Sequence, residues 1–253
     1  MNKTILGGLS FIFLILISLI IILSTTGIKT KKFNNFISQK IKENNERIEL
    51  DLEAIHFKLD IKEASLFLET DSPKIYYRSI SIPSNKIKVY LDFLSIVKSE
   101  IKIKKVIVNL DEITVKELKT LSKYLKPSNF QSFTKNKLID GKIKSEIEFY
   151  LNENNKLNNF ITRGQVSDLT IEISKNLELK DTSFSFFADR TDILLKNFFG
   201  KTELFTIKEG DLKADLSSEI NIESNFKSEI KLNGEIKKLQ KLFPHYNYIK
   251  NFS

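Results

Sequence analysis

Apolar and polar positions change their spacing several times along the chain. Residues 5–23 are all uncharged and nearly all apolar. A helix of this length spans roughly 28 Å, close to the ~30 Å hydrocarbon core of a bilayer. The run is longer than the apolar core of a cleaved signal peptide, and residues 24–27 match a cleavage site poorly. It therefore predicts an uncleaved membrane anchor in preference to a signal peptide.

A second stretch, residues 31–45, has a helical period. Phe33, Phe36, Ile37 and Ile41 fall on one stripe of a helix, with lysines around them. Such a helix can lie at a membrane surface or pack on the next domain, and the pattern does not choose between the two.

From Arg47 onward the period is two, as in half-buried strands. Ile48, Leu50 and Leu52 alternate with acids, and the phase slips after Ala54, which predicts a bulge in one long strand. Further alternating runs predict strands, with turns at residues 72–73 and 83–85. These runs lie at residues 66–68, 80–82, 87–91 and 101–110. Residues 92–100 are expected to form a short helix.

One helix start is marked by a capping box. Thr114 stands three residues before Glu117, so each side chain can bond the other residue's backbone N–H. The helix is expected to end by Pro127, and the polar residues 128–137 are expected to form a linker. After Leu138 the chain alternates almost throughout, with Asn, Asp, Gly and Ser between the runs, which predicts an antiparallel meander.

The predicted fold class is mostly β with a few helices. A sheet with one apolar face must cover it by folding into a sandwich, closing as a barrel, or curling into a groove that holds an apolar ligand. The residues expected to line such a groove share alternating apolar positions after residue 138. They are Ile147, Phe149, Leu151, Leu169, Ile171, Ile173, Phe184, Phe186, Ile220, Ile222, Ile230 and Leu232. The same residues would form the core of a sandwich.

Composition narrows the chemistry. The chain has 40 basic and 32 acidic residues, a net charge of +8, but only four of the basic residues are arginines. The lysines are interspersed with acids and apolar residues, so no nucleic-acid partner is expected. Cysteine is absent, and the two histidines, His56 and His245, lie far apart in sequence. With no Gly-rich phosphate loop and no HExxH pattern, we expect no enzyme activity, no metal site and no cofactor.

Residues 87–109, IKVYLDFLSIVKSEIKIKKVIVN, resemble the AsmA family of bacterial envelope proteins, which has a strand, a "DFLSLL"-like helix and an "I-x-I-x-K-V/I" strand after an N-terminal anchor. Residues 66–83 fit the same pattern, and residues 164–169, GQVSDL, are similar to the family's "G-x-V-x-D-L" strand. Family members are usually longer, so this chain is expected to be an N-terminal part, to assemble with others, or to work locally at the inner membrane.

The resemblance implies three domains. These are a transmembrane anchor at residues 1–30, a chorein-like α+β cap at 31–135, and an elongated antiparallel β-groove at 136–253. It implies an inner-membrane protein with its body in the periplasm, whereas the lysines that follow the apolar run would place the body in the cytoplasm on the positive-inside rule.

The expected function is binding or conduction of phospholipid in outer-membrane biogenesis. The bilayer, phospholipid and other envelope proteins are the expected partners. The alternative is an assembly factor that influences outer-membrane protein insertion without lipid transfer.

Overall fold

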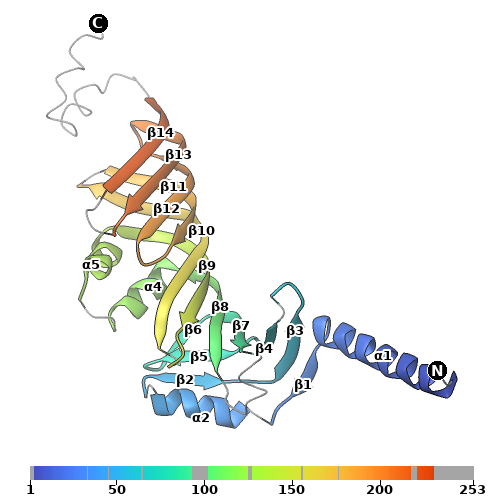
Figure 1. The fold of residues 1–253 in the computed structure, drawn as a ribbon. Helices are drawn as coiled ribbons and strands as arrows, with labels where there is room; N and C mark the ends of the chain where they lie inside the picture. Colours follow the sequence, from blue (N-terminus) through green and yellow to red (C-terminus); the bar gives the residue numbers. More distant parts are fainter. Residues whose placement is uncertain are drawn as a thin grey trace, which may run out of the picture. The chain divides into compact units, whose positions relative to one another are not determined.

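The computed structural model describes residues 3–32, 34–44, 46–63, 65–92, 102–124, 127–154, 156–175, 177–217 and 221–230. The fold is mostly β, with 60% strand and few helices, which confirms the expected class. In chain order the elements are α1 (Lys3–Ser24), β1 (Ile28–Thr30), α2 (Asn34–Asn44), β2 (Ile48–Asp51), β3 (Ile55–Asp60), β4 (Ser65–Asp71), β5 (Lys74–Tyr77), β6 (Ile80–Ile82), β7 (Ser84–Leu91), β8 (Ile103–Thr114), α4 (Val115–Ser122), α5 (Asn129–Asn136), β9 (Leu138–Leu151), β10 (Leu157–Ser174), β11 (Leu177–Ala188), β12 (Asp192–Lys201), β13 (Phe205–Asp215) and β14 (Asn221–Ile230) (Figure 1).

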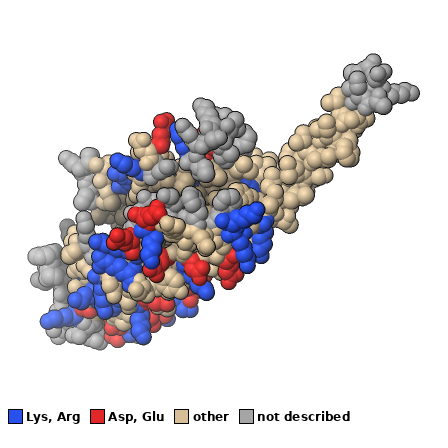
Figure 2. All heavy atoms as spheres, turned by 90° about the horizontal axis from the view of Figure 1, so that it is seen from below, with Lys and Arg blue, Asp and Glu red and all other residues tan. Residues whose placement is uncertain are grey.

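The N-terminal helix α1 is apolar and unburied. Its stretch Gly7–Ser24 has a mean hydropathy of 2.7 and is long and apolar enough to cross a membrane. In Figure 2 it projects as a rod without coloured side chains, whereas basic and acidic residues intermix over the rest of that face. The helix expected at residues 5–23 is confirmed.

The strands form two sheets. The larger has eleven strands in the order β1-β3-β4-β7-β8-β9-β10-β11-β12-β13-β14, and the smaller has three in the order β2-β5-β6. From β7 to β14 each strand lies beside the next one in sequence, and β11 to β14 pair antiparallel. The expected antiparallel meander is confirmed.

The bulge predicted after Ala54 is wrong. β2 pairs with β5 in the small sheet, whereas β3 pairs with β1 and β4 in the large one. The connection between them buries Leu52 and Ala54, and Asn34 donates a hydrogen bond from Nδ2 to the Leu52 carbonyl oxygen at 2.6 Å. The slip in phase therefore marks a change of sheet.

The capping box at the start of α4 is confirmed. The Glu117 N–H donates to Thr114 Oγ1 at 3.3 Å, and the Thr114 N–H donates to Glu117 Oε2 at 2.8 Å. The linker predicted for residues 128–137 is wrong, because α5 occupies residues 129–136 with Ser128 as its N-cap. Most of the helix predicted for residues 92–100 lies outside the described residues.

Two compact units make up the chain. Unit 1 comprises Met1–Glu112 and Ser145–Thr162, and unit 2 comprises Ile113–Lys144 and Arg163–Ser253. The divisions fall within the long strands β8, β9 and β10, so they are units of packing, and the three expected domains stay a prediction.

In unit 1 the large sheet has one apolar and one charged face. Phe57, Leu68, Val89 and Val106 are successive register partners, so they share a face. The opposite face carries Lys58, Phe67, Tyr90 and Lys105, which are again successive partners. A buried cluster of Phe67, Tyr90 and Ile107 lies on that charged face.

Candidate functional site

The core of unit 2 forms where α4 packs on the sheet. Val115 of α4 is buried against Leu138, Val166 and Leu169. Gly141 permits a close approach in this core, since a Cβ at that position would lie 2.7 Å from the Leu169 Cα. Five further apolar side chains of unit 2 pack on the cluster and are only partly buried. They are Leu118, Ile143, Ile171, Phe184 and Phe186.

Beyond this core the apolar face continues across β12 to β14. Phe186 lies opposite Leu195, and Leu195 lies opposite Leu212. Register partners in a sheet project to the same side. Two residues away along the strands, Gly210 lies opposite Phe226, which places Phe226 on that side as well. We call the surface formed by Phe184, Phe186, Leu195, Phe198, Leu212 and Phe226 the aromatic face.

A bulge in β12 places Phe198 on this face. Ser185 pairs with Lys196 but Ser183 pairs with Phe199, so β12 has one residue more than β11 in this interval. Asn197 has a positive φ of 55° within the bulge, and its N–H donates to Asp211 Oδ1 at 3.2 Å. Without the extra residue, strand alternation would put Phe199 on the aromatic face and Phe198 on the other side.

Three phenylalanine rings form a row on the aromatic face. The ring centroids of Phe184 and Phe198 are 5.5 Å apart in a stacked pair, and those of Phe198 and Phe226 are 5.6 Å apart edge to face. These separations fall in the range that favours aromatic pairing. The row therefore extends from β11, beside the core, to β14.

Two glycines make room for rings on this surface. A Cβ at Gly164 would lie 2.8 Å from Phe186 Cε1, and a Cβ at Gly210 would lie 2.0 Å from Phe226 Cδ1. Each of these two rings thus lies close over a position that has no side chain.

The opposite face of β12 to β14 is charged. Lys227 Nζ lies 2.8 Å from Glu209 Oε2, and Lys208 pairs with Glu229. The bond to Glu209 raises the pKa of Lys227. Leu194 lies opposite Lys213 on this side, directly next to Leu195 on the other. One face of the sheet is thus suited to water and the other to apolar groups.

Exposure rises along the aromatic face away from α4. Leu169 beneath α4 is 3% exposed, whereas Phe226 is 40% and Ile222 is 61% exposed. Ile222 shares this face, since it lies opposite Ala214. In the residues that the structure describes, α5 is the last helix of the chain. An apolar ligand could therefore contact the β12–β14 part of the face directly.

The residues predicted to line a groove fall into five groups. Leu169 is core, and Ile171, Phe184 and Phe186 pack against that core. Ile173 and Ile222 are exposed. Ile147, Phe149 and Leu151 are half-buried and belong to unit 1. Ile220, Ile230 and Leu232 lie outside the described side chains.

Sequence reasoning missed Leu195, Phe198, Leu212 and Phe226 as parts of this surface. Leu212 and Phe226 stand in alternating runs and could have been included on that signal. Phe198 could not, because its neighbour Phe199 is equally apolar and only the bulge at Asn197 decides between them.

The most heavily charged cluster of unit 1 surrounds Glu69. This carboxylate is 4% exposed and lies 2.5 Å from Lys58 Nζ, 3.5 Å from Lys86 Nζ and 3.8 Å from Lys88 Nζ. Burial alone would raise the pKa of Glu69, but the Lys58 hydrogen bond and the three positive charges outweigh it and lower the pKa. Asp71 Oδ1 also lies 3.6 Å from Lys86 Nζ, so three lysines and two carboxylates form a structural ion-pair network.

No group of three or more His, Cys, Asp or Glu side chains suited to a metal ion occurs among the described residues. Comparison with known proteins adds no relative: no family model matches the chain, and no curated protein or solved structure matches it.

Proposed function

We propose that the aromatic face of unit 2 binds the acyl chains of phospholipids while α1 anchors the protein in the inner membrane. The row formed by Phe184, Phe198 and Phe226 carries the proposal, because it extends from the packed core to exposed positions on β14. Exposed apolar surfaces of this kind usually mark contact with an apolar partner. The charged opposite face favours water on the other side of the same strands.

The energy of such binding comes from apolar burial alone. A fully buried methylene contributes about 0.8 kcal/mol. If a one-sided surface covers roughly half of each methylene, ten methylenes contribute about 4 kcal/mol before the ordering of the chain is subtracted. A binding energy of this size suits reversible binding, so the lipid can leave again.

The resemblance to the AsmA family gives the proposal its biological setting. On that basis the body lies in the periplasm, residues 31–135 form a chorein-like cap, and residues 136–253 form a β-groove that takes part in phospholipid supply to the outer membrane. The antiparallel meander from β7 to β14 supports this assignment.

A photoactivatable phospholipid tests the acyl-chain proposal. The reactive group is placed near the end of one acyl chain, and the labelled peptides of the detergent-solubilised full chain are mapped by mass spectrometry. We expect labels on Leu195, Leu212 and Phe226 in preference to Leu194 and Lys213. Equal labelling of both faces, or labelling confined to α1, would contradict binding at the aromatic face.

A second candidate is an assembly factor that adds a strand to a partner protein. Within the described residues β14 is the last strand of the large sheet, and its side chains from Asn221 to Glu229 are exposed. Such an edge can pair with another chain. Photocrosslinkers at Ser224 and Ser228 that capture an outer-membrane protein, with no lipid bound to the purified chain, would favour this candidate.

A further inference from the structure

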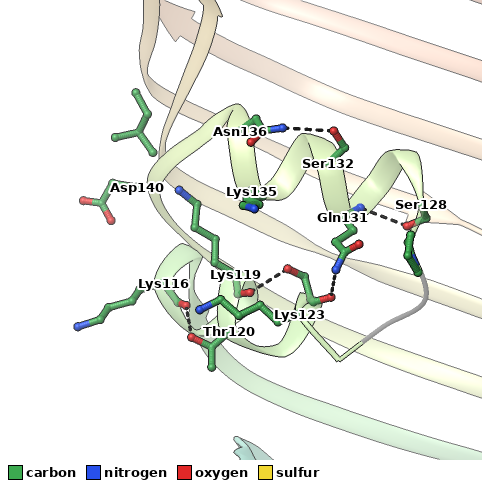
Figure 3. A pocket seen from close by; sticks show the side chains of 13 residues that line it. Lys116, Lys119, Thr120, Lys123, Ser128, Gln131, Ser132, Lys135, Asn136 and Asp140 are labelled. Carbon is green, nitrogen blue, oxygen red and sulfur yellow. Dashed lines mark hydrogen bonds between the residues drawn. The ribbon is translucent and has the colours of Figure 1, made fainter.

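A lysine-lined hollow lies between α4 and α5 of unit 2 (Figure 3). Its volume is about 1080 Å³. Four lysines line it, Lys116, Lys119, Lys123 and Lys135, against one carboxylate, Asp140. The hollow thus has three uncompensated positive charges, whereas basic and acidic residues are more nearly balanced in the whole chain, at 40 and 32.

Two properties of α4 place these lysines together. Its apolar residues Val115 and Leu118 pack on the sheet core. Lys116, Lys119 and Lys123 occur at spacings of three and four residues, so they share another side of the helix. Lys135 of α5 lines the hollow with them.

The polar floor of the hollow is held in place by hydrogen bonds. Gln131 Nε2 of α5 donates to the Ser122 carbonyl oxygen at 2.8 Å, which joins the two helices. The Ser122 hydroxyl in turn donates to the Lys119 carbonyl oxygen at 2.8 Å. The hollow therefore has a hydrogen-bonded base with lysine side chains around it.

The lysines have no acidic partner that would explain their gathering. Residues 115–137 contain six lysines and a single acid, Glu117. Glu117 is engaged in the capping box, where its bonds from the Thr114 N–H and hydroxyl lower its pKa. Across the described part of the chain, none of the four lysines in the hollow takes part in a salt bridge.

From this charge and geometry we infer that the hollow binds a phosphate group. A phosphate brings one to two negative charges and several acceptor oxygens, and lysine binds it as a point charge. A bound carboxylate, with its single negative charge, would leave most of the excess of three positive charges uncompensated. The group could belong to a phospholipid head group or to a soluble phosphate monoester, and both offer the same chemistry. The inference does not require acyl-chain binding at the aromatic face.

Calorimetric titration of the full chain, at low salt and in a phosphate-free maltoside detergent, tests whether the hollow binds a phosphate group. The probes are inorganic phosphate, glycerol 3-phosphate and dihexanoyl phosphatidic acid below its micelle concentration. We expect saturable binding of at least one probe and weakening of about tenfold or more in the triple variant Lys116→Gln/Lys119→Gln/Lys123→Gln. Binding of all three probes points to a soluble phosphate compound, and binding of the lipid alone points to a head group.

A matched triple variant controls for overall charge. Lys144→Gln/Lys196→Gln/Lys213→Gln removes the same charge from exposed lysines of unit 2 and is expected to bind within about twofold of the unaltered chain. The inference is overturned if no probe binds at millimolar concentration, or if the two triple variants lose binding equally. Leu195→Asp should leave phosphate binding intact, which separates this site from the aromatic face.

Discussion

Phe226 lies across the Gly210 backbone, and the two residues are register partners between β13 and β14. A Cβ added to Gly210 would come within 2.0 Å of Phe226 Cδ1, so the ring and a side chain at position 210 exclude each other. The glycine is therefore needed for the position of the ring, and the ring extends the aromatic row to the exposed strand.

Gly210→Ala should displace the Phe226 ring and lower the free energy of unfolding by about 1 kcal/mol. In a Phe226→Ala background the same substitution should cost close to zero, because the clash is gone. Urea unfolding of the four proteins in detergent measures this coupling as a double-mutant cycle. Additive effects of the two substitutions would show that the ring does not occupy the space above Gly210.

Thr114→Ala should destabilise α4 locally by about 1 kcal/mol through loss of the N-cap. The pKa of Glu117 is lowered in the folded state, so its contribution is complete above the unfolded pKa of about 4.3. It is lost as the pH falls through the lower folded value. The difference in hydrogen exchange of the α4 amides between the two proteins should therefore be larger at pH 6 than in acid, where only the loss of the bond from the Glu117 N–H to Thr114 Oγ1 remains. A constant difference down to the lowest pH would contradict a role for the ionised carboxylate.

Glu69→Gln should destabilise unit 1 by about 2 kcal/mol, since it leaves Lys58, Lys86 and Lys88 close together without their shared carboxylate. Because the folded pKa of Glu69 is lowered, the stabilising effect is present above the unfolded pKa and fades as acid protonates the folded group. Glu49→Gln removes an exposed partner of Lys42 and is the control, with an expected cost below about 0.5 kcal/mol. Hydrogen exchange of the β4 amides compares the two variants. Equal effects of the two substitutions on hydrogen exchange would show that burial of Glu69 adds nothing to its stabilising contribution.

Alkaline carbonate extraction tests the role of α1. The unaltered chain should stay in the membrane pellet, and Leu14→Arg should weaken insertion by about 2.5–3.5 kcal/mol because the charge lies near the middle of the apolar run. Leu14→Ala is the control and should stay in the pellet. Recovery of the unaltered chain in the soluble fraction would contradict membrane anchoring.

The elements with a strong local pattern could be predicted from the sequence. The apolar run gave α1, the Thr114–Glu117 spacing gave α4, and strict alternation gave the meander after Leu138. Local chemistry was sufficient for these elements because the residues that specify each of them lie within the element itself.

The predictions that were wrong or incomplete depend on contacts between different elements of the fold. The phase slip after Ala54 is a change of sheet, which depends on which strands β2 and β3 find as partners. The polar residues of α5 concealed a helix whose Gln131 bonds α4. On the aromatic face, the choice between Phe198 and Phe199 depends on one bulge, so the site could be predicted only in outline.

Leu194 and Leu195 give the most direct test, because they are adjacent leucines on opposite faces of β12. Each is replaced by Asp in the full chain, folding is checked by thermal unfolding, and co-purified phospholipid is measured by native mass spectrometry. Leu195→Asp should retain less than about a tenth of the bound phospholipid, equivalent to ~1.4 kcal/mol, whereas Leu194→Asp should retain nearly all of it. Equal phospholipid content in the two folded variants would contradict lipid binding at the aromatic face.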